Sequence, residues 1–210
     1  MRESAIKVKF IDFLLNGLIN SDALIVNEMS FADSSRRADL VTIGDYLEAY
    51  EIKSEKDSLD KLPEQLKDYD KYFHSVYVIC HKSHLKNVQN ISRKFGIYVI
   101  TERGVTKIRK ARRRKKIKVK FLLDYLDRNS LASLIKEKTL SYRFIINLPI
   151  NDFRENIEGK IKYDHLYPAV RKYLVNKYQP SNNQFLSERG KVTVEEDLLL
   201  LKKTSQTISN

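Results

Sequence analysis

Two carboxylates and one ammonium, those of Asp39, Glu51 and Lys53, are spaced so that they could meet in one metal-assisted hydrolytic site. Carboxylate oxygens, with water completing the shell, suit Mg²⁺ or Mn²⁺. Such an ion polarises a phosphodiester and lowers the pKa of a bound water. A neighbouring lysine can orient or help to deprotonate that water, or offset charge in the transition state. The three residues therefore predict phosphodiester hydrolysis, provided that the fold brings them together.

A hairpin decides whether they meet. Two β-prone runs flank the turn signal Gly44-Asp45. Period-two alternation places Glu51 and Lys53 on one face of the second strand. A loop of two residues would send Asp39 to the opposite face, whereas a loop of three residues places it directly opposite Glu51. We predict the odd-length loop or an equivalent bulge. The two carboxylates then repel each other, and a bound divalent cation would compensate.

The elements around this hairpin follow from hydrophobic periodicity. An apolar stripe predicts a helix over residues 5–19, and the β-prone run 23–29 places Glu28 near the end of a strand. Pro63 suits the first turn of a helix after the hairpin. A helix separates two further strands, at residues 76–80 and 97–100. The order helix, strand, hairpin, helix, strand, helix, strand predicts an α/β fold with a mixed sheet flanked by helices.

These residues resemble a known superfamily. The segments Arg37-Ala38-Asp39-Leu40 and Tyr50-Glu51-Ile52-Lys53, followed by Gln65 and Tyr69, are similar to the PD-(D/E)XK, or restriction-endonuclease-like, nucleases, including small bacterial members. The resemblance covers roughly residues 20–100. It departs from the usual pattern in one respect, since Ala38 stands where a proline is common. An acidic-x-Lys tripeptide alone would more simply be the solvated face of an edge strand.

The resemblance implies a restriction-endonuclease-like core of αβββαβ order and assigns roles to individual residues. Asp39 and Glu51 would be metal ligands, Glu28 a supporting acidic ligand, and Lys53 the catalytic lysine. Gln65 and Tyr69 match a Q-x-x-x-Y motif that helps to orient the site and the nucleic acid. Dimers are common in this superfamily, so a homodimer is a possible assembly.

The charge of the chain indicates a polyanionic partner. Thirty-nine Lys and Arg against 27 Asp and Glu give a formal net charge of +12, which favours nucleic acid, and DNA first. The basic tract, residues 107–120, contains no acidic residue. It could contact phosphates, serve as a solvated linker, or add a charged strand to the sheet edge. The candidate phosphate contacts are Arg109, Lys110, Arg112, Arg113, Arg114, Lys115 and Lys116.

The same tract marks a change in character along the chain. We expect a nuclease-like domain over residues 1–110, a mainly helical basic region over 111–203, and a frayed tail at 204–210. In the second region, residues 163–178 interleave aromatic side chains with cations, which fits either a DNA-contacting helix or an amphipathic core helix.

The sequence also indicates a compartment and a choice of two functions. The single cysteine, Cys80, cannot form an internal disulfide, and the chain has neither a signal-peptide core nor an apolar run long enough for a membrane span. We therefore expect a soluble, cytoplasmic protein without a membrane partner. The first function is a Mg²⁺-dependent nuclease, with Mn²⁺ as an alternative ion. The second is a catalytically silent module of nuclease-like fold that binds nucleic acid or recruits a partner.

Overall fold

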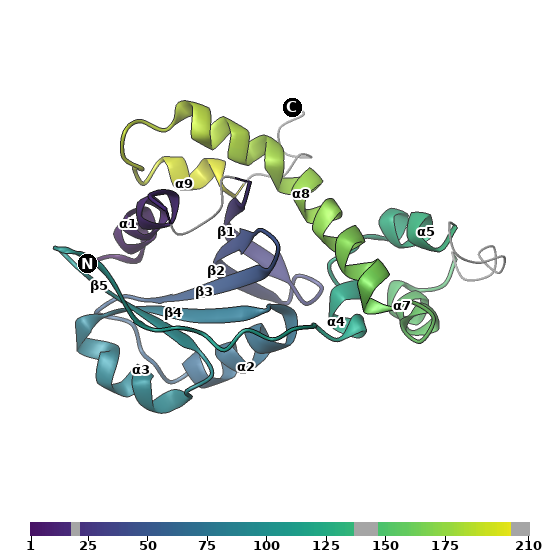
Figure 1. The fold of residues 1–210 in the computed structure, drawn as a ribbon, viewed down its shortest axis with the longest axis horizontal. Helices are drawn as coiled ribbons and strands as arrows, with labels where there is room; N and C mark the ends of the chain where they lie inside the picture. The colour runs from purple at the N-terminus through teal and green to yellow at the C-terminus, as the bar shows by residue number, and fades with distance from the viewer. Residues whose placement is uncertain (18–21, 137–146, 203–210) are drawn as a thin grey trace.

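A mixed sheet of six strands lies at the centre of the computed structural model, which describes residues 1–17, 22–136 and 147–202 (Figure 1). The strands lie side by side in chain order. The first three form an antiparallel meander, the next two run parallel to the third, and the sixth returns antiparallel. Their bounds are β1 Leu24–Phe31, β2 Arg36–Ile43, β3 Leu47–Lys53, β4 Ser75–His81, β5 Gly96–Thr101 and β6 Gly104–Arg109.

Helices cover both faces of this sheet, as the sequence predicts. Helix α2 connects β3 to β4, and α3 connects β4 to β5 through the short 3-10 helix η1. Right-handed crossovers place successive connecting helices on the same face, and α2 and α3 do lie together there, while α1 packs on the other face (Figure 1). The bounds are α1 Glu3–Leu15, α2 Leu62–Tyr72, η1 Lys82–His84 and α3 Leu85–Ile91.

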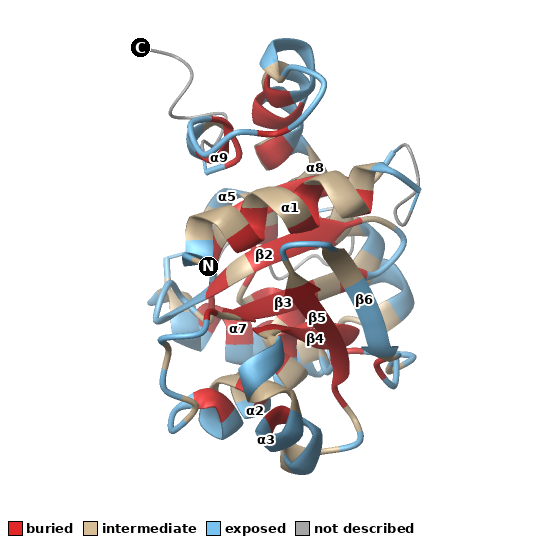
Figure 2. Ribbon diagram, turned by 90° about the vertical axis from the view of Figure 1, so that its left-hand side faces the viewer, coloured by how far each residue is buried: buried red, intermediate tan, exposed pale blue. Residues whose placement is uncertain are grey.

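The predicted order of elements is present, and β6 follows it. This is the charged edge strand that the first part of the basic tract could form. Figure 2 shows the contrast: β3, β4 and β5 are buried, whereas β6 is mostly exposed. Its exposed Lys107 discourages pairing with another strand.

The hairpin between β2 and β3 has the predicted odd-length loop. Ile43 pairs with Leu47, so three residues form the turn. Counting away from the turn along both strands, from this pair through Leu40 and Tyr50, places Asp39 opposite Glu51. Because side chains alternate between faces, this register sets both carboxylates on the α2 side of the sheet. The prediction on which the candidate site depends is therefore confirmed at the level of register.

Where the structure describes it, the chain from residue 119 onward is mainly helical. The long helix α8 buries Leu166, Val170, Leu174 and Tyr178, a four-residue repeat that makes one face of the helix part of the core. Residues 163–178 therefore form an amphipathic core helix, and contact of its exposed face with DNA stays a prediction. The bounds are α4 Val119–Leu123, α5 Arg128–Lys136, α7 Ile150–Glu158, α8 Tyr163–Glu188 and α9 Asp197–Leu200.

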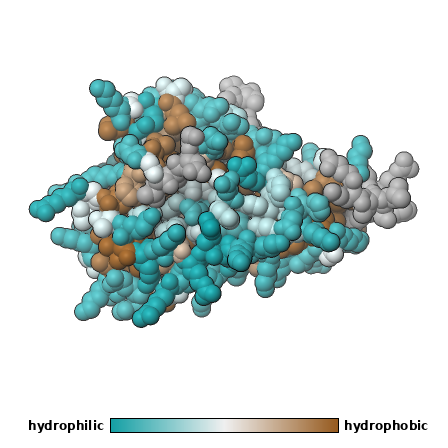
Figure 3. Space-filling model, in the orientation of Figure 1, coloured by the Kyte–Doolittle hydropathy of each residue, from teal (hydrophilic) through white to brown (hydrophobic). Residues whose placement is uncertain are grey.

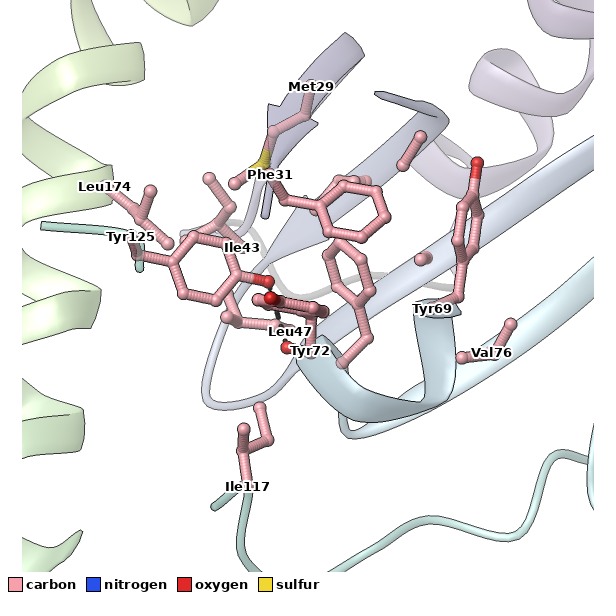
Figure 4. Packing of buried hydrophobic residues seen from close by; sticks show 14 of the residues in the cluster. Met29, Phe31, Ile43, Leu47, Tyr69, Tyr72, Val76, Ile117, Tyr125 and Leu174 are labelled. Carbon is pink, nitrogen blue, oxygen red and sulfur yellow. Dashed lines mark hydrogen bonds between the residues drawn. The ribbon is translucent and has the colours of Figure 1, made fainter. Parts of the chain in front are cut away.

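These helices share a hydrophobic cluster with the sheet. In Figure 4, Phe31 of β1 and Tyr72 of α2 lie beside Tyr125 and Leu174 from the C-terminal region. The Tyr125 hydroxyl donates to the Tyr72 carbonyl oxygen over 2.9 Å. The division into domains at residue 110 stays a prediction. The expected frayed tail, 204–210, lies outside the described residues, and no helix among those described is long and apolar enough to cross a membrane.

The outer edge of β1 is covered by the end of the chain. The Asn182 side chain on α8 accepts a hydrogen bond from Ile25 N–H and donates one to Ile25 C=O, each over 2.8 Å. The Asn27 N–H donates to Leu201 C=O over 3.0 Å. An exposed strand edge would otherwise present unpaired backbone groups. One amide side chain thus takes the place of a neighbouring strand.

Replacing Asn182 by alanine should lower the free energy of unfolding by about 2 kcal/mol, because a buried N–H and a buried C=O lose their partners. The measurement is urea denaturation followed by circular dichroism. Asn183→Ala is the matched control, since Asn183 is the next residue on the helix and is exposed. Equal midpoints for the two variants would contradict this account of the edge.

Candidate functional site

The candidate site lies where β2 and β3 separate. The paired ladder between these strands ends with Leu40 opposite Tyr50. Beyond that pair, Asp39 Oδ2 accepts a hydrogen bond from the Ile52 N–H over 2.8 Å. The Asp39 side chain therefore takes the place of the next backbone hydrogen bond between the strands. Its carboxylate lies between the two strands, on the side of Glu51.

Glu51 is almost completely buried, with 2% of its surface exposed. Its Oε2 lies 2.6 Å from the Tyr69 hydroxyl, and its Oε1 lies 2.8 Å from Lys53 Nζ. Burial and the Glu51 charge raise the pKa of Tyr69 well above its ordinary value, so this hydroxyl stays protonated and donates. In Figure 4 the Tyr69 hydroxyl points away from the hydrophobic side chains drawn around its ring. Both carboxylate oxygens of Glu51 are thus held in place.

Helix α2 positions the two supporting residues. Gln65 and Tyr69 lie one turn apart on the helix, which begins at Leu62 with Pro63 in its first turn. Gln65 Oε1 accepts a hydrogen bond from Lys53 Nζ over 3.1 Å. The Lys53 ammonium therefore bridges the β3 carboxylate and an amide of α2. The sequence-predicted set of Asp39, Glu51, Lys53, Gln65 and Tyr69 is brought together in one place.

The two carboxylates influence each other's charge. Burial, and next the charge of Glu51, raise the pKa of Asp39 to about 7. The hydrogen bond from Ile52 N–H and the charge of Lys7 oppose this rise but do not cancel it. Near neutral pH the site therefore carries a negative charge that the protein compensates incompletely. A divalent cation would supply that compensation.

Glu28 lies on the neighbouring strand but is engaged elsewhere. It sits at an irregular point of β1, with φ at +58°, between the pairs Asn27–Leu40 and Met29–Ala38. Three cations surround its carboxylate: Lys7 at 3.4 Å, Arg37 at 3.2 Å and Lys202 at 2.9 Å. Burial alone would raise the pKa of Glu28, but the Lys202 hydrogen bond and these three charges lower it overall. Within residues 1–17, 22–136 and 147–202, no three His, Cys, Asp or Glu side chains are grouped to hold a metal ion.

The sequence reasoning missed Lys7. Only 4% of its side chain is exposed, and its Nζ lies 2.8 Å from Glu3 as well as 3.4 Å from Glu28. The signal was available: Lys7 falls between Ile6 and Phe10 on the buried face of α1, where a cation needs a partner. Lys202, by contrast, approaches through α9, and no local pattern in the sequence connects it to β1.

The basic tract crosses the far end of the sheet from this site. After β6 it runs extended, with Arg112 N–H donating to Lys94 C=O and Arg114 N–H to His74 C=O. Lys94 lies two residues before β5 and His74 immediately precedes β4, so the tract passes the amino ends of the parallel strands. Glu51 and Lys53 lie at the carboxyl end of β3. Since β3 has seven residues, the two places are separated by about 20 Å along the strand.

Some cations of the tract are engaged by other parts of the protein, some are exposed, and Lys116 is both. Arg109 donates to carbonyl oxygens at the end of α3 and the start of β5, which is a structural role. Arg114 pairs with Asp70 at 2.7 Å, and Lys116 pairs with Asp164 at 2.8 Å. The exposed side chains of the predicted set are Lys110, Arg112, Arg113, Lys115 and Lys116.

Comparison with known proteins places the chain in a family. Over 213 aligned residues it is 29% identical to Protein cII of Enterobacteria phage P4, covering 98% of this chain and 80% of the phage protein. A solved structure of a protein of unknown function from Silicibacter pomeroyi is similar over 55% of this chain and 75% of its own, at 13% identity and a TM-score of 0.43. The model of the family described as bacteriophage P4 protein cII matches residues 1–202. The chain therefore belongs to the bacteriophage P4 protein cII family.

Proposed function

We propose that this protein is a metal-dependent nuclease with a restriction-endonuclease-like core. The observation that carries the proposal is the meeting of Asp39, Glu51 and Lys53 where β2 and β3 separate, with Tyr69 and Gln65 of α2 holding two of them. An edge strand with a solvated acidic-x-Lys pattern would not bury its glutamate or fix its lysine by two hydrogen bonds.

The donor set fits Mg²⁺ or Mn²⁺. Asp39 and Glu51 would hold the ion, and Asp39 Oδ1 is free of the hydrogen bond that engages Oδ2. The raised pKa of Asp39 supports this fit, because a cation would relieve the repulsion that causes part of the rise. When bound, such an ion supplies an activated water and polarises the phosphodiester.

Each residue of the chain has a separate task in this proposal. Lys53 orients the attacking water or offsets charge on the phosphate, with Gln65 fixing its ammonium. Tyr69 keeps Glu51 in one orientation through its 2.6 Å hydrogen bond. The substrate is nucleic acid, and DNA first, since a net charge of +12 attracts a polyanion. The exposed cations of the basic tract would contact its phosphates.

A second candidate function rests on the contacts of the acidic groups. Glu28 is surrounded by three cations, and Glu51 is already bound to Lys53. A site whose carboxylates are satisfied by protein cations has less need of a metal. This observation favours a nuclease-like module that binds nucleic acid, or recruits another protein, without cutting it.

The deciding experiment is a cleavage assay with the full chain. Single-stranded, duplex and branched DNA and RNA are incubated with Mg²⁺, Mn²⁺ or EDTA. We expect metal-dependent cleavage that is lost in Glu51→Gln and retained in Glu158→Gln, an exposed glutamate at the end of α7. Salt-sensitive binding without cleavage of any substrate, unchanged by Glu51→Gln, would instead favour the silent module.

A further inference from the structure

Four aromatic rings gather beside the basic tract at the amino end of β3. The Tyr46 and His74 rings meet edge to face with centroids 5.3 Å apart, and His74 meets Tyr167 in the same way at 4.8 Å. Tyr163 stacks on Tyr167 at 5.5 Å with an interplanar angle of 6°. These rings come from the β2–β3 loop, the residue before β4, and the first turns of α8. They form one continuous aromatic cluster.

The cluster is held rigidly. Tyr167 donates from its hydroxyl to Asp45 C=O over 2.8 Å, and Arg171 Nε donates to Gly44 C=O over 2.7 Å. These bonds fasten the hairpin loop to α8. His74 adds no charge near neutral pH, because burial and the charges of Arg114 and Arg113 lower its pKa to about 4. Tyr46 remains 37% exposed, so a large ring is presented to solvent on a fixed support.

Cations lie over these rings. The Arg113 guanidinium carbon is 4.0 Å from the Tyr46 ring centroid, and Lys116 Nζ is 5.0 Å from that of Tyr163. Arg112 and Lys115 are exposed on the same extended stretch. In Figure 3, hydrophilic side chains crowd the face that the segment between β6 and α4 crosses in Figure 1. Of the nearby acids, Asp164 is paired with Lys116, and Asp45 is exposed.

We propose that this aromatic and basic surface binds unpaired nucleotides of single-stranded nucleic acid. An exposed tyrosine ring with an arginine guanidinium against it offers aromatic and planar cationic groups on which a base can stack, and every base has a face that can stack. Arg112, Arg113 and Lys115 add exposed positive charge beside the rings, which attracts a phosphate backbone. Bases inside a duplex are already stacked on their neighbours, so only the ends of a duplex could stack on these rings.

This inference takes only the nucleic-acid partner from the proposed function and adds the strand form. The surface lies at the opposite end of β3 from Glu51, about 17 Å away from Tyr46 to Glu51 along the strand. Substitutions at one place therefore leave the other intact. The two proposals can fail separately.

The test is equilibrium binding of a fluorescent single-stranded oligonucleotide to the full chain in EDTA, over a range of salt concentrations. Tyr46→Ala should weaken binding about tenfold, whereas Tyr46→Phe, which keeps the ring, should bind like the wild type. Arg113→Ala should reduce the slope of log affinity against log salt by about 0.7, the value for one phosphate contact. Lys191→Ala, which removes an exposed charge before α9, is the matched control.

A second probe separates stacking from charge. An abasic oligonucleotide of equal length should bind the wild type and Tyr46→Ala equally, since it has no bases to stack. The inference is overturned if the abasic and ordinary strands bind alike, or if Tyr46→Ala and Arg113→Ala match Lys191→Ala. If binding shows the expected pattern but the cleavage assay with Mg²⁺ or Mn²⁺ detects no cleavage, this surface is supported and the proposed nuclease function is contradicted. If the protein cleaves nucleic acid but Tyr46→Ala does not weaken binding, the nuclease function is supported and this surface is contradicted.

Discussion

Asp39→Asn should make the metal-free protein more stable at pH 8, by about 2 kcal/mol, and should abolish stabilisation by Mg²⁺. At that pH the wild-type carboxylate is charged, desolvated and close to Glu51. Asparagine keeps an oxygen that can accept the 2.8 Å hydrogen bond from Ile52 N–H and removes the charge. A variant that gains stability while losing a function is typical of a strained functional site.

The pH dependence of stability follows from the direction in which the pKa of Asp39 is shifted. The pKa of Asp39 is about 7 in the folded chain and near 3.8 when unfolded, so the folded state binds more protons between these values. The favourable contribution of Asp39 is complete below pH 3.8 and is lost as the pH rises through 7. Each pH unit is worth about 1.4 kcal/mol. Between the two pKa values the contribution of Asp39 to the free energy of unfolding would change by roughly 4 kcal/mol. Because Asp39 is partly exposed, solvent screening reduces the expected effect to about half of this, or about 2 kcal/mol.

Chemical denaturation at pH 4.5, 6 and 8 measures this effect. The advantage of Asp39→Asn over the wild type should grow with pH across that series. Added Mg²⁺ should stabilise the wild type by an amount that grows with the logarithm of its concentration above the dissociation constant, and it should leave Asp39→Asn unchanged. Glu158→Gln provides the control for loss of an exposed carboxylate. A pH-independent difference between Asp39→Asn and the wild type would show that neither burial nor Glu51 raises the pKa of Asp39 in the folded chain.

Much of the fold was predictable because local patterns and topology agree. Short β-prone runs indicated the strands, Pro63 marked the start of α2, and the spacing of two such runs limited the hairpin to two registers. Chemistry then favours the odd-length loop, since only that loop places Asp39 opposite Glu51. The structure has that register. Local sequence patterns, together with the requirement that Asp39 face Glu51, were sufficient to predict the register of the hairpin.

The surroundings of the site were not predictable in the same way. Glu28 was expected to support a metal, but its partners Lys7 and Lys202 come from the two ends of the chain. The sequence did not indicate where the basic tract lies relative to the site, and its hydrogen bonds to Lys94 and His74 fix it at the amino ends of β5 and β4. Contacts of this kind depend on tertiary packing, and no periodicity in the sequence encodes them.

Lys53→Met should destabilise the protein by about 3 kcal/mol, the largest loss that we expect from a single change in the site. Glu51 is 2% exposed, and Lys53 is the cation that pairs with it at 2.8 Å. Removing one partner of a buried ion pair leaves an uncompensated charge, which costs more than the pair itself contributes. For a chain of 210 residues this corresponds to a fall of roughly 9 °C in Tm.

The pair can be separated from its surroundings by a double-mutant cycle. Glu51→Gln in the Lys53→Met background should restore most of the lost stability, because the amide is neutral and can still accept from Tyr69. Lys191→Met controls for loss of an exposed lysine. If the two substitutions were additive, Lys53 and Glu51 would not be coupled, and Lys53 would lack the fixed position that its proposed work on a phosphate requires. A large coupling energy together with lost cleavage in each single variant would tie the stability of this ion pair to the chemistry of the site.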